Sequence, residues 1–269
     1  MLPPAIRRPV LRRLFPSDTA VPVEAGDVYR DLALPPGAHG RPYVITNMVS
    51  TVDGKAVLGT SAAGIGSRTD ALLMRQVRAA VDAVMHGAGT LRAEIVDPRV
   101  GPARSRERVA RGLAPQPLAV AVSGSLDLEP TNRFFVNGPA GTVVLASSRA
   151  PAEWRRRLAP YASLLVDDGP TVDLEAGLRR LHDEFGVRRL LSEGGPTLNQ
   201  SLLDTGLIDE VFWTIAPKLA GGHGPGTIEV DTPAVKIAAR LQLVSLHEHD
   251  GELFARYRLQ RGPNGRYLT

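Results

Sequence analysis

From residue 43 onward, short apolar runs rich in β-branched side chains alternate with amphipathic stretches. Such runs of four to nine residues predict strands, whereas apolar positions three and four apart predict helices. We expect strands at residues 43–51, 83–87, 118–122, 143–146, 163–166, 188–192, 210–215, 241–249 and 252–259. We expect helices at residues 69–81, 152–160, 174–185 and 197–205.

Strands that alternate with helices indicate an α/β fold, because parallel neighbours need a crossover connection. The last two strands meet at Asp250-Gly251, a strong hairpin signal that predicts a sheet mixed at one edge. We expect one domain over residues 41–269. It follows a proline-rich N-terminal arm, residues 1–40, with one short helix at residues 24–32. The polar, Pro/Arg-rich segment 97–117 predicts a long surface loop.

Composition narrows the function. The chain has no cysteine, which excludes disulfides, thiol nucleophiles and cysteine-ligated metals. Its histidines lack ligand spacing, so no metal site is expected. No apolar run approaches a membrane span, and the first residues carry arginines and prolines where a secretory signal needs an apolar stretch, so we expect a cytoplasmic protein that does not contact a membrane. The formal net charge of +4 comes from scattered arginines, which favours a small anionic partner over nucleic acid.

The stretch SEGGPTLNQSLLD, residues 192–204, joins a predicted strand to a predicted helix. Pro196 suits the first helical turn, and two glycines before it leave the backbone bare. Free N–H groups at a helix N-terminus attract phosphate. Glu193 stands where the carboxyl end of a parallel strand is expected, the edge at which open α/β sheets bind ligands. The alternative is a tight turn with a helix-terminal charge and no ligand.

A second junction, AVMHGAGTLRAE at residues 83–94, repeats this design with Gly87, Gly89 and Thr90. Two such loops can hold one dinucleotide, although neither the GxGxxG fingerprint nor the Walker pattern is present. A third stretch, residues 47–70, is rich in small residues and predicts a loop over a ligand, or a plain turn capped by Ser67 or Thr69. His86 is interpreted as a core or site-wall residue.

Three segments, NMVSTVDGKA, RAAVDAVMHGAGTLRAE and LLSEGGPTLNQSLLDTGLIDEVFWTIAPKLAGG, resemble the pyrimidine reductase of riboflavin biosynthesis, a domain often fused to a deaminase. The likeness covers residues 42–260. It implies a three-layer fold like that of dihydrofolate reductase, with a central mixed, mostly parallel sheet flanked by helices. It also implies a homodimer, NADPH as hydride donor, and a phosphorylated ribosylaminopyrimidine substrate. Because no zinc-binding deaminase is present, we expect a stand-alone reductase.

The resemblance also implies site residues. The cofactor loop falls on Gly195 through Ser201, and further cofactor contacts fall on Thr90, Glu94 and the backbone of Val49. Substrate contacts fall on Ser61, Arg78 and Glu193, with Arg78 suited to a phosphate. In full, the expected cofactor-binding set is Val49, Gly64, Thr90, Glu94, Gly194, Gly195, Pro196, Thr197, Leu198 and Asn199.

Three assignments depart from the family pattern or stay open. The segment EIVDP has extra residues, so either Glu94 or Asp97 can match the acidic position that follows the threonine in the family. The serine that contacts the cofactor falls somewhere in residues 123–125. The proton in the reaction is assigned to Glu94 or Glu193, and Arg149 is a candidate for the 2′-phosphate of NADPH. Two other functions stay open: reduction of a pterin or folate by the same fold, and a non-catalytic NADP-binding protein.

Overall fold

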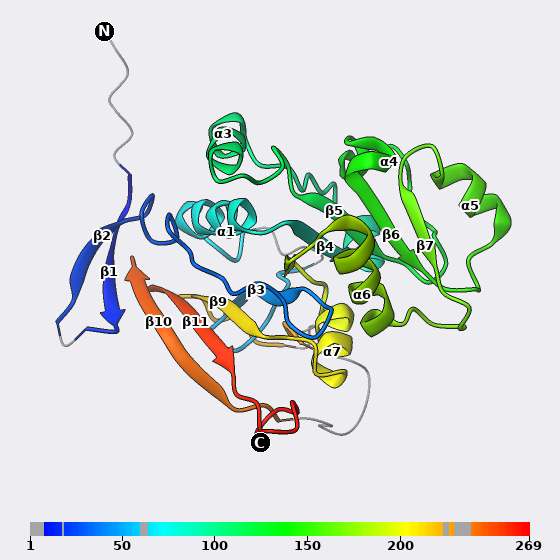
Figure 1. The fold of residues 1–269 in the computed structure, drawn as a ribbon. Coiled ribbons are helices and arrows are strands. Elements are labelled where there is room, and N and C mark those ends of the chain that lie inside the picture. The colour runs from blue at the N-terminus through cyan, green and yellow to red at the C-terminus, as the bar shows by residue number, and fades with distance from the viewer. Residues whose placement is uncertain (1–7, 18, 60–63, 223–225, 229–237) are drawn as a thin grey trace, which may run out of the picture.

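The computed structural model describes residues 8–17, 19–59, 64–222, 226–228 and 238–269. One twisted sheet of eleven strands runs through them in the order β2-β1-β10-β11-β9-β3-β8-β4-β5-β6-β7 (Figure 1). The strands are β1 (Val10–Phe15), β2 (Val21–Glu24), β3 (Tyr43–Thr51), β4 (Ala83–Gly87), β5 (Leu118–Val122), β6 (Thr142–Ala146), β7 (Ser163–Val166), β8 (Arg189–Ser192), β9 (Glu210–Ala216), β10 (Leu241–His249) and β11 (Glu252–Leu259). The helices are α1 (Arg68–Ala80), α2 (Ala88–Ala93), α3 (Pro102–Ala110), α4 (Gly138–Gly141), α5 (Ala152–Leu158), α6 (Leu174–Phe185) and α7 (Pro196–Asp204), with a 3₁₀ turn η1 (Arg133–Phe135).

The sheet is mixed, as the sequence predicts. Strands β9, β3, β8, β4, β5, β6 and β7 pair in parallel, while β11 pairs antiparallel with β9 and with β10. The Asp250-Gly251 turn closes the β10–β11 hairpin, with both residues at positive φ. The α/β fold with a dihydrofolate-reductase-like sheet is therefore confirmed.

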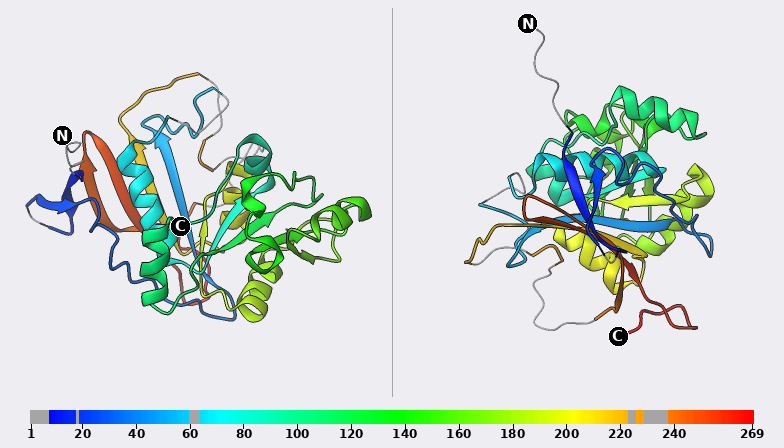
Figure 2. Two further views of the ribbon diagram at one scale, coloured as in Figure 1. Left: turned by 90° about the horizontal axis from the view of Figure 1, so that it is seen from above. Right: turned by 90° about the vertical axis from the view of Figure 1, so that its left-hand side faces the viewer.

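Helices cover both faces of the parallel strands and make three layers (Figure 2). Alternate residues of a strand point to opposite faces, so Val44 and Ile45 belong to different apolar clusters. The cluster around Val44 includes residues of α6 and α7, whereas the cluster around Ile45 includes residues of α1. A third cluster packs α2, η1 and α5 on the strands beyond β4. The carboxyl ends of the parallel strands consequently open between α1, α2 and α7.

Two expectations about irregular segments are wrong. The arm contributes strands β1 and β2 to the sheet, and residues 25–31, within the expected helix 24–32, form turns. The segment 97–117 contains helix α3, which begins at Pro102. Only Leu11 of β1 is fully buried, so the strand lacks the alternation that marks a half-buried strand. No helix in the described part of the chain is long and apolar enough to cross a bilayer.

Candidate active site

A cleft with two adjoining cavities lies at the carboxyl ends of the parallel strands. The cavities measure about 510 and 480 Å³, and Gly89, Thr90, Gly195 and Pro196 line both. The first extends towards α1 and β3, and the second towards α6. Open α/β sheets place ligands at this edge. The tips of α2 and α7 therefore form a ridge between two halves of one cleft.

The α7 tip needs glycine at two successive positions. Gly194 and Gly195 have φ of 75° and 81°, a region that L-residues with a side chain rarely adopt. A Cβ on Gly195 would lie 3.0 Å from Thr90 Oγ1, and one on Gly194 would lie 2.7 Å from Asn199 Nδ2. The amide of Gly87 donates to the Gly194 carbonyl at 2.8 Å. The two glycines thus let the α7 tip pass directly over the start of α2.

The first turn of α7 lacks a side-chain cap. Gly195 is the N-cap residue and supplies no side-chain acceptor, and Pro196 has no N–H to satisfy. The following N–H groups and the positive end of the helix dipole therefore suit an anion at the ridge. The N-cap of α2, Gly87, likewise supplies no side-chain acceptor.

Glu193 is the acid next to this ridge, and two basic side chains hold it. Arg78 Nε and Nη2 each donate to one carboxylate oxygen at 2.5 Å, and His86 Nε2 lies 3.1 Å from Oε2. Burial opposes the charge on Glu193, but the Coulomb attraction and hydrogen bonds of Arg78 and His86 outweigh it and lower its pKa to about 2. Glu193 is therefore a fixed carboxylate.

This geometry bears on two expectations from the sequence. Glu193 is unsuited to supply a proton, because its carboxylate is held ionised against Arg78. Arg78 does make a bidentate contact, but its partner is Glu193 and not a phosphate; its Nη1 donates to the Asp97 carbonyl at 3.0 Å. Both residues line the larger cavity, so they remain candidates for substrate contact.

Asp70 is a second carboxyl group in the same cavity, and the sequence analysis did not select it. It lies in the first turn of α1 and accepts a hydrogen bond from Thr214 Oγ1 at 2.7 Å. Burial, together with the nearby charges of Glu252 and Glu193, raises the pKa of Asp70 to about 6, although the Thr214 bond opposes the shift. Among the four acidic residues that line this cavity, Asp70 and Glu193 thus have pKa values that move in opposite directions.

A local sequence pattern explains why the sequence analysis did not select Asp70. The Ser67-x-x-Asp70 spacing reads as an N-terminal cap of α1, and Ser67 does accept from the amides of Thr69 and Asp70. The side chain of Asp70, however, bonds across to β9 at Thr214. Only the pairing of strands distant in sequence brings these two residues together.

The structure brings most of the other expected residues to the cleft. Val49, Thr90, Glu94, Gly195, Pro196 and Asn199 line the larger cavity, and Thr197 and Leu198 line the smaller one. Gly64 lines neither, and its carbonyl accepts from Lys218 Nζ. Ser61 lies outside the described residues. Arg149 is exposed and also lines neither cavity, whereas Arg92 of α2 lines the smaller one.

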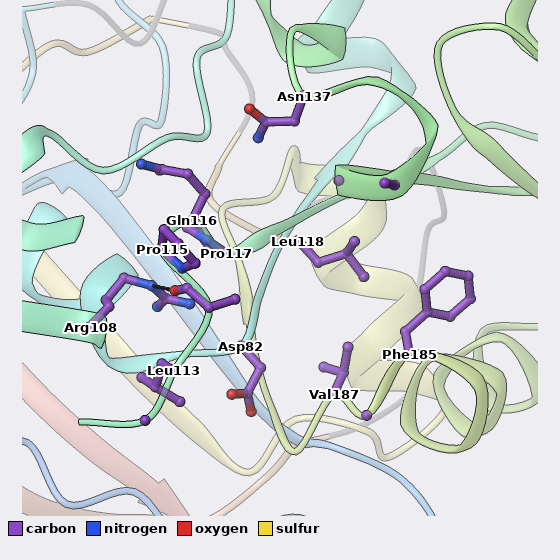
Figure 3. Close-up of a pocket in the computed structure, with 15 residues that line it drawn as sticks. Asp82, Arg108, Leu113, Pro115, Gln116, Pro117, Leu118, Asn137, Phe185 and Val187 are labelled. Atoms are coloured by element: carbon purple, nitrogen blue, oxygen red, sulfur yellow. Dashed lines mark hydrogen bonds between the residues drawn. The ribbon is translucent and has the colours of Figure 1, made fainter. Parts of the chain in front are cut away.

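A third cavity, of about 590 Å³, lies at the opposite edge of the sheet (Figure 3). Arg108 of α3 projects beside it, and its guanidinium donates hydrogen bonds to main-chain carbonyls. Its Nε donates to Ala114 at 2.8 Å and its Nη1 donates to Val81 at 2.5 Å. Burial lowers the pKa of Arg108 to about 10. This arginine thus closes the C-terminal end of α1.

The donor set of the cleft fits a dinucleotide. It offers bare amides at a ridge and a cavity on each side, which match a diphosphate flanked by two ring systems. Clusters of three or more metal-ligating side chains do not occur within the described ranges.

The fold and this cleft define an α/β reductase of the dihydrofolate-reductase-like class. Residues 42–254 match the model of the RibD C-terminal domain family. The chain therefore belongs to the RibD C-terminal domain family, and it is an oxidoreductase of that type.

Two similar proteins are named 2,5-diamino-6-ribosylamino-4(3H)-pyrimidinone 5′-phosphate reductase. The one from Methanothermobacter thermautotrophicus is 37% identical over 70% of this chain and 83% of its own length. The one from Archaeoglobus fulgidus is 36% identical over 70% of this chain and 86% of its own length. A pyrimidine reductase-like protein from Corynebacterium diphtheriae, 22% identical, has a similar fold with a TM-score of 0.75; the match covers 89% of this chain and all of the other.

Proposed function

We propose that this protein uses NADPH to reduce the ribosyl group of a 6-ribosylaminopyrimidine 5′-phosphate to a ribityl group. The proposal rests mainly on the ridge of bare amides at Gly195 and the first turn of α7, which separates two cavities of similar size. A dinucleotide needs this arrangement, because its charged diphosphate joins two separate ring systems. The substrate class is that named for the two archaeal relatives.

The residues of the cleft divide between the two ligands. The α7 amides and Thr90 would hold the diphosphate, and Val49 on β3 borders the larger cavity where the nicotinamide belongs. The bound reduced nicotinamide supplies a hydride. Asn47, Arg78 and Glu193 line the same cavity and would position a polar pyrimidine and its sugar by hydrogen bonds.

Preference for NADPH over NADH rests on Arg92. Among the residues that the structure describes, it is the one charged side chain that lines the smaller cavity, where the adenosine half belongs. Within the same residues its exposed head donates one hydrogen bond, to the Asp127 carbonyl at 3.4 Å. No carboxylate among the described residues lies within ion-pair distance of it. A guanidinium in this state can turn to a 2′-phosphate.

The Arg92→Ala variant tests this assignment with Arg149→Ala as its matched control, since both arginines are exposed. We expect Arg92→Ala to raise the Kd for NADPH by roughly 10-fold, in the range of one charged hydrogen bond, and to leave the Kd for NADH unchanged. Arg149→Ala should change neither Kd. Equal Kd values for the two coenzymes in the wild-type protein would contradict a phosphate-specific site.

The function itself is tested by following NADPH absorbance with three candidate substrates. These are the 2,5-diamino-pyrimidinone ribotide, its deaminated uracil counterpart, and dihydrofolate. We expect turnover with at least one of the ribotides, with a ribityl product identified by mass spectrometry. Turnover with dihydrofolate alone would favour a folate reductase, and coenzyme binding without any turnover would favour a non-catalytic protein. A homodimer is part of the proposal, and sedimentation analysis tests it.

A further inference from the structure

We propose that the Asp70 carboxyl group is the general acid of this site and supplies the proton that the reduction consumes. This assignment rests on the proposed function. It concerns a residue that neither the cofactor ridge nor the Glu193–Arg78 pair requires.

The placement of Asp70 carries the assignment. Its side chain lines the larger cavity together with Asn47, Met74, Arg78 and Glu193, so it faces the space where the sugar would be reduced. Thr214 Oγ1 donates to Oδ1 at 2.7 Å, and Oδ2 lies close to Gly66, where there is no room for an added Cβ. Thr214 is 5% exposed and lies behind Asp70 on β9, so it orients the carboxyl group. The Thr214 bond thus fixes a carboxyl group that borders the cavity.

The surroundings of Asp70 favour its protonated form. Glu252 on β11 and Glu193 at the end of β8 contribute negative charge, and the buried phenol of Tyr29 lies close enough to feel the charge of Asp70. The basic groups on this side, Arg78 and His86, are bound to Glu193. Burial is the largest cause of a pKa near 6, which places the proton within reach of a reaction near neutral pH.

The chemistry needs one proton at one atom. Reduction breaks the bond between C1′ and the ring oxygen O4′ and forms a bond between C1′ and the incoming hydride. The electron pair of the broken bond stays on O4′, which must take a proton to become the 4′-hydroxyl of the ribityl chain. The balance is substrate plus NADPH plus one proton to product plus NADP⁺. The protonated Asp70 donates to O4′, and solvent then reprotonates the carboxylate.

Kinetics against pH give the first test. A general acid works only while protonated, so kcat/KM of the wild-type protein should fall about 10-fold per pH unit above an apparent pKa near 6. This fall is the descending limb of the pH profile. Asp70→Asn should lower kcat by about 10²- to 10⁴-fold, leave KM within about 3-fold, and remove this limb. Asp183→Asn, an exposed carboxyl on α6, serves as control and should match the wild type.

Thr214→Val supplies a variant that leaves Asp70 in place. The Thr214 hydrogen bond lowers the pKa of Asp70, so its loss should shift the limb to higher pH by up to about one unit. A limb that stays in place in Thr214→Val would contradict the proposal, as would full activity of Asp70→Asn.

Stability gives a test without turnover. Below about pH 4, Asp70 is protonated in both the folded and the unfolded state. Between the ordinary aspartate pKa of 3.8 and about 6, the unfolded state ionises first and the folded state loses stability; above 6 the loss is complete. Asp70→Asn should therefore have a higher urea-denaturation midpoint than the wild type at pH 7.5, and no higher midpoint at pH 4. A side chain that serves only to bind Thr214 would instead leave Asp70→Asn destabilised at both pH values.

The failures are distinguishable. If the wild-type protein turns over neither ribotide, the proposed function fails. If it turns over a ribotide and Asp70→Asn does so at the same rate and with the same pH profile, only the assignment of Asp70 fails.

Discussion

The two edges of the parallel strands each carry a cavity, and they differ in what their charged groups do. At the amino edge, Nε and Nη1 of Arg108 donate to main-chain carbonyls, and the side chain closes the end of α1. At the carboxyl edge, the α7 tip has no side-chain cap, and a carboxyl group with a raised pKa faces the cavity. The amino-edge cavity has a volume of about 590 Å³, whereas the larger of the two carboxyl-edge cavities has about 510 Å³.

The difference shows that volume does not identify a site. At the amino edge, Arg108 donates its hydrogen bonds to main-chain carbonyls, so this side chain stabilises the fold. At the carboxyl edge, polar groups are held in place yet remain directed at open space, which is the condition for binding and catalysis. Substitutions at the two edges should therefore separate function from folding.

Glu193→Gln should have the largest effect. It leaves the buried Arg78 without its carboxylate, so we expect unfolding free energy at pH 7 to fall by about 3 kcal/mol and kcat/KM to fall by at least about 100-fold. In the wild type, the low pKa of Glu193 contributes stability above the ordinary glutamate pKa of 4.5, and this stability is lost as the pH falls towards 2. Chemical denaturation and steady-state kinetics measure both effects.

Glu184→Gln is the control for that variant, because Glu184 forms an exposed pair with Arg180 on α6. It should change stability by less than about 0.5 kcal/mol and kinetics not at all. Normal kinetics in Glu193→Gln would mean that the pair is purely structural, and the contrast between the edges would weaken.

Gly195→Ala tests the ridge. A Cβ there meets Thr90 Oγ1 at 3.0 Å, and a φ of 81° strains alanine, so the Kd for NADPH should rise by about 10- to 100-fold. Gly186→Ala is matched in φ, at 67°, but its Cβ would meet nothing within 4 Å. It should cost about 1 kcal/mol of stability and leave coenzyme binding unchanged. Equal Kd values in the two variants would remove the ridge from the coenzyme site.

Arg108→Met should have the smallest effect on function. It removes the donors to the end of α1, so unfolding free energy should fall by about 1–3 kcal/mol. KM for both substrates should stay within about 2-fold of the wild type. A 10-fold change in either KM, with unchanged stability, would show that the amino edge takes part in function.

The sequence was informative where structure is local. Strands β3, β4, β5, β7, β10 and β11 and helix α6 have the predicted limits, because each is bounded by turn residues and has a clear apolar period. Strands β1 and β2 were missed because β1 pairs with β10 at the far end of the chain, β2 pairs with β1 at the edge of the sheet, and both strands bury few side chains. Helix α3 was missed because its face is almost wholly polar, Arg108 included.

The site divides in the same way. The α7 tip follows from Gly194, Gly195 and Pro196, whose conformational preferences are local. The Arg78–Glu193 pair and the Asp70–Thr214 bond join residues that are far apart in sequence, so no spacing indicates them. The pKa of each acid depends on those partners, which is why the sequence analysis selected Glu193 without its role and did not select Asp70.

The most direct test of the account is a crystal structure of the protein with NADP⁺. We predict the diphosphate within hydrogen-bonding distance of the backbone amides of Thr197 and Leu198. The nicotinamide should lie beside Val49, in the larger of the two carboxyl-edge cavities. A coenzyme bound at the amino-edge cavity, or an α7 tip without a diphosphate, would contradict it.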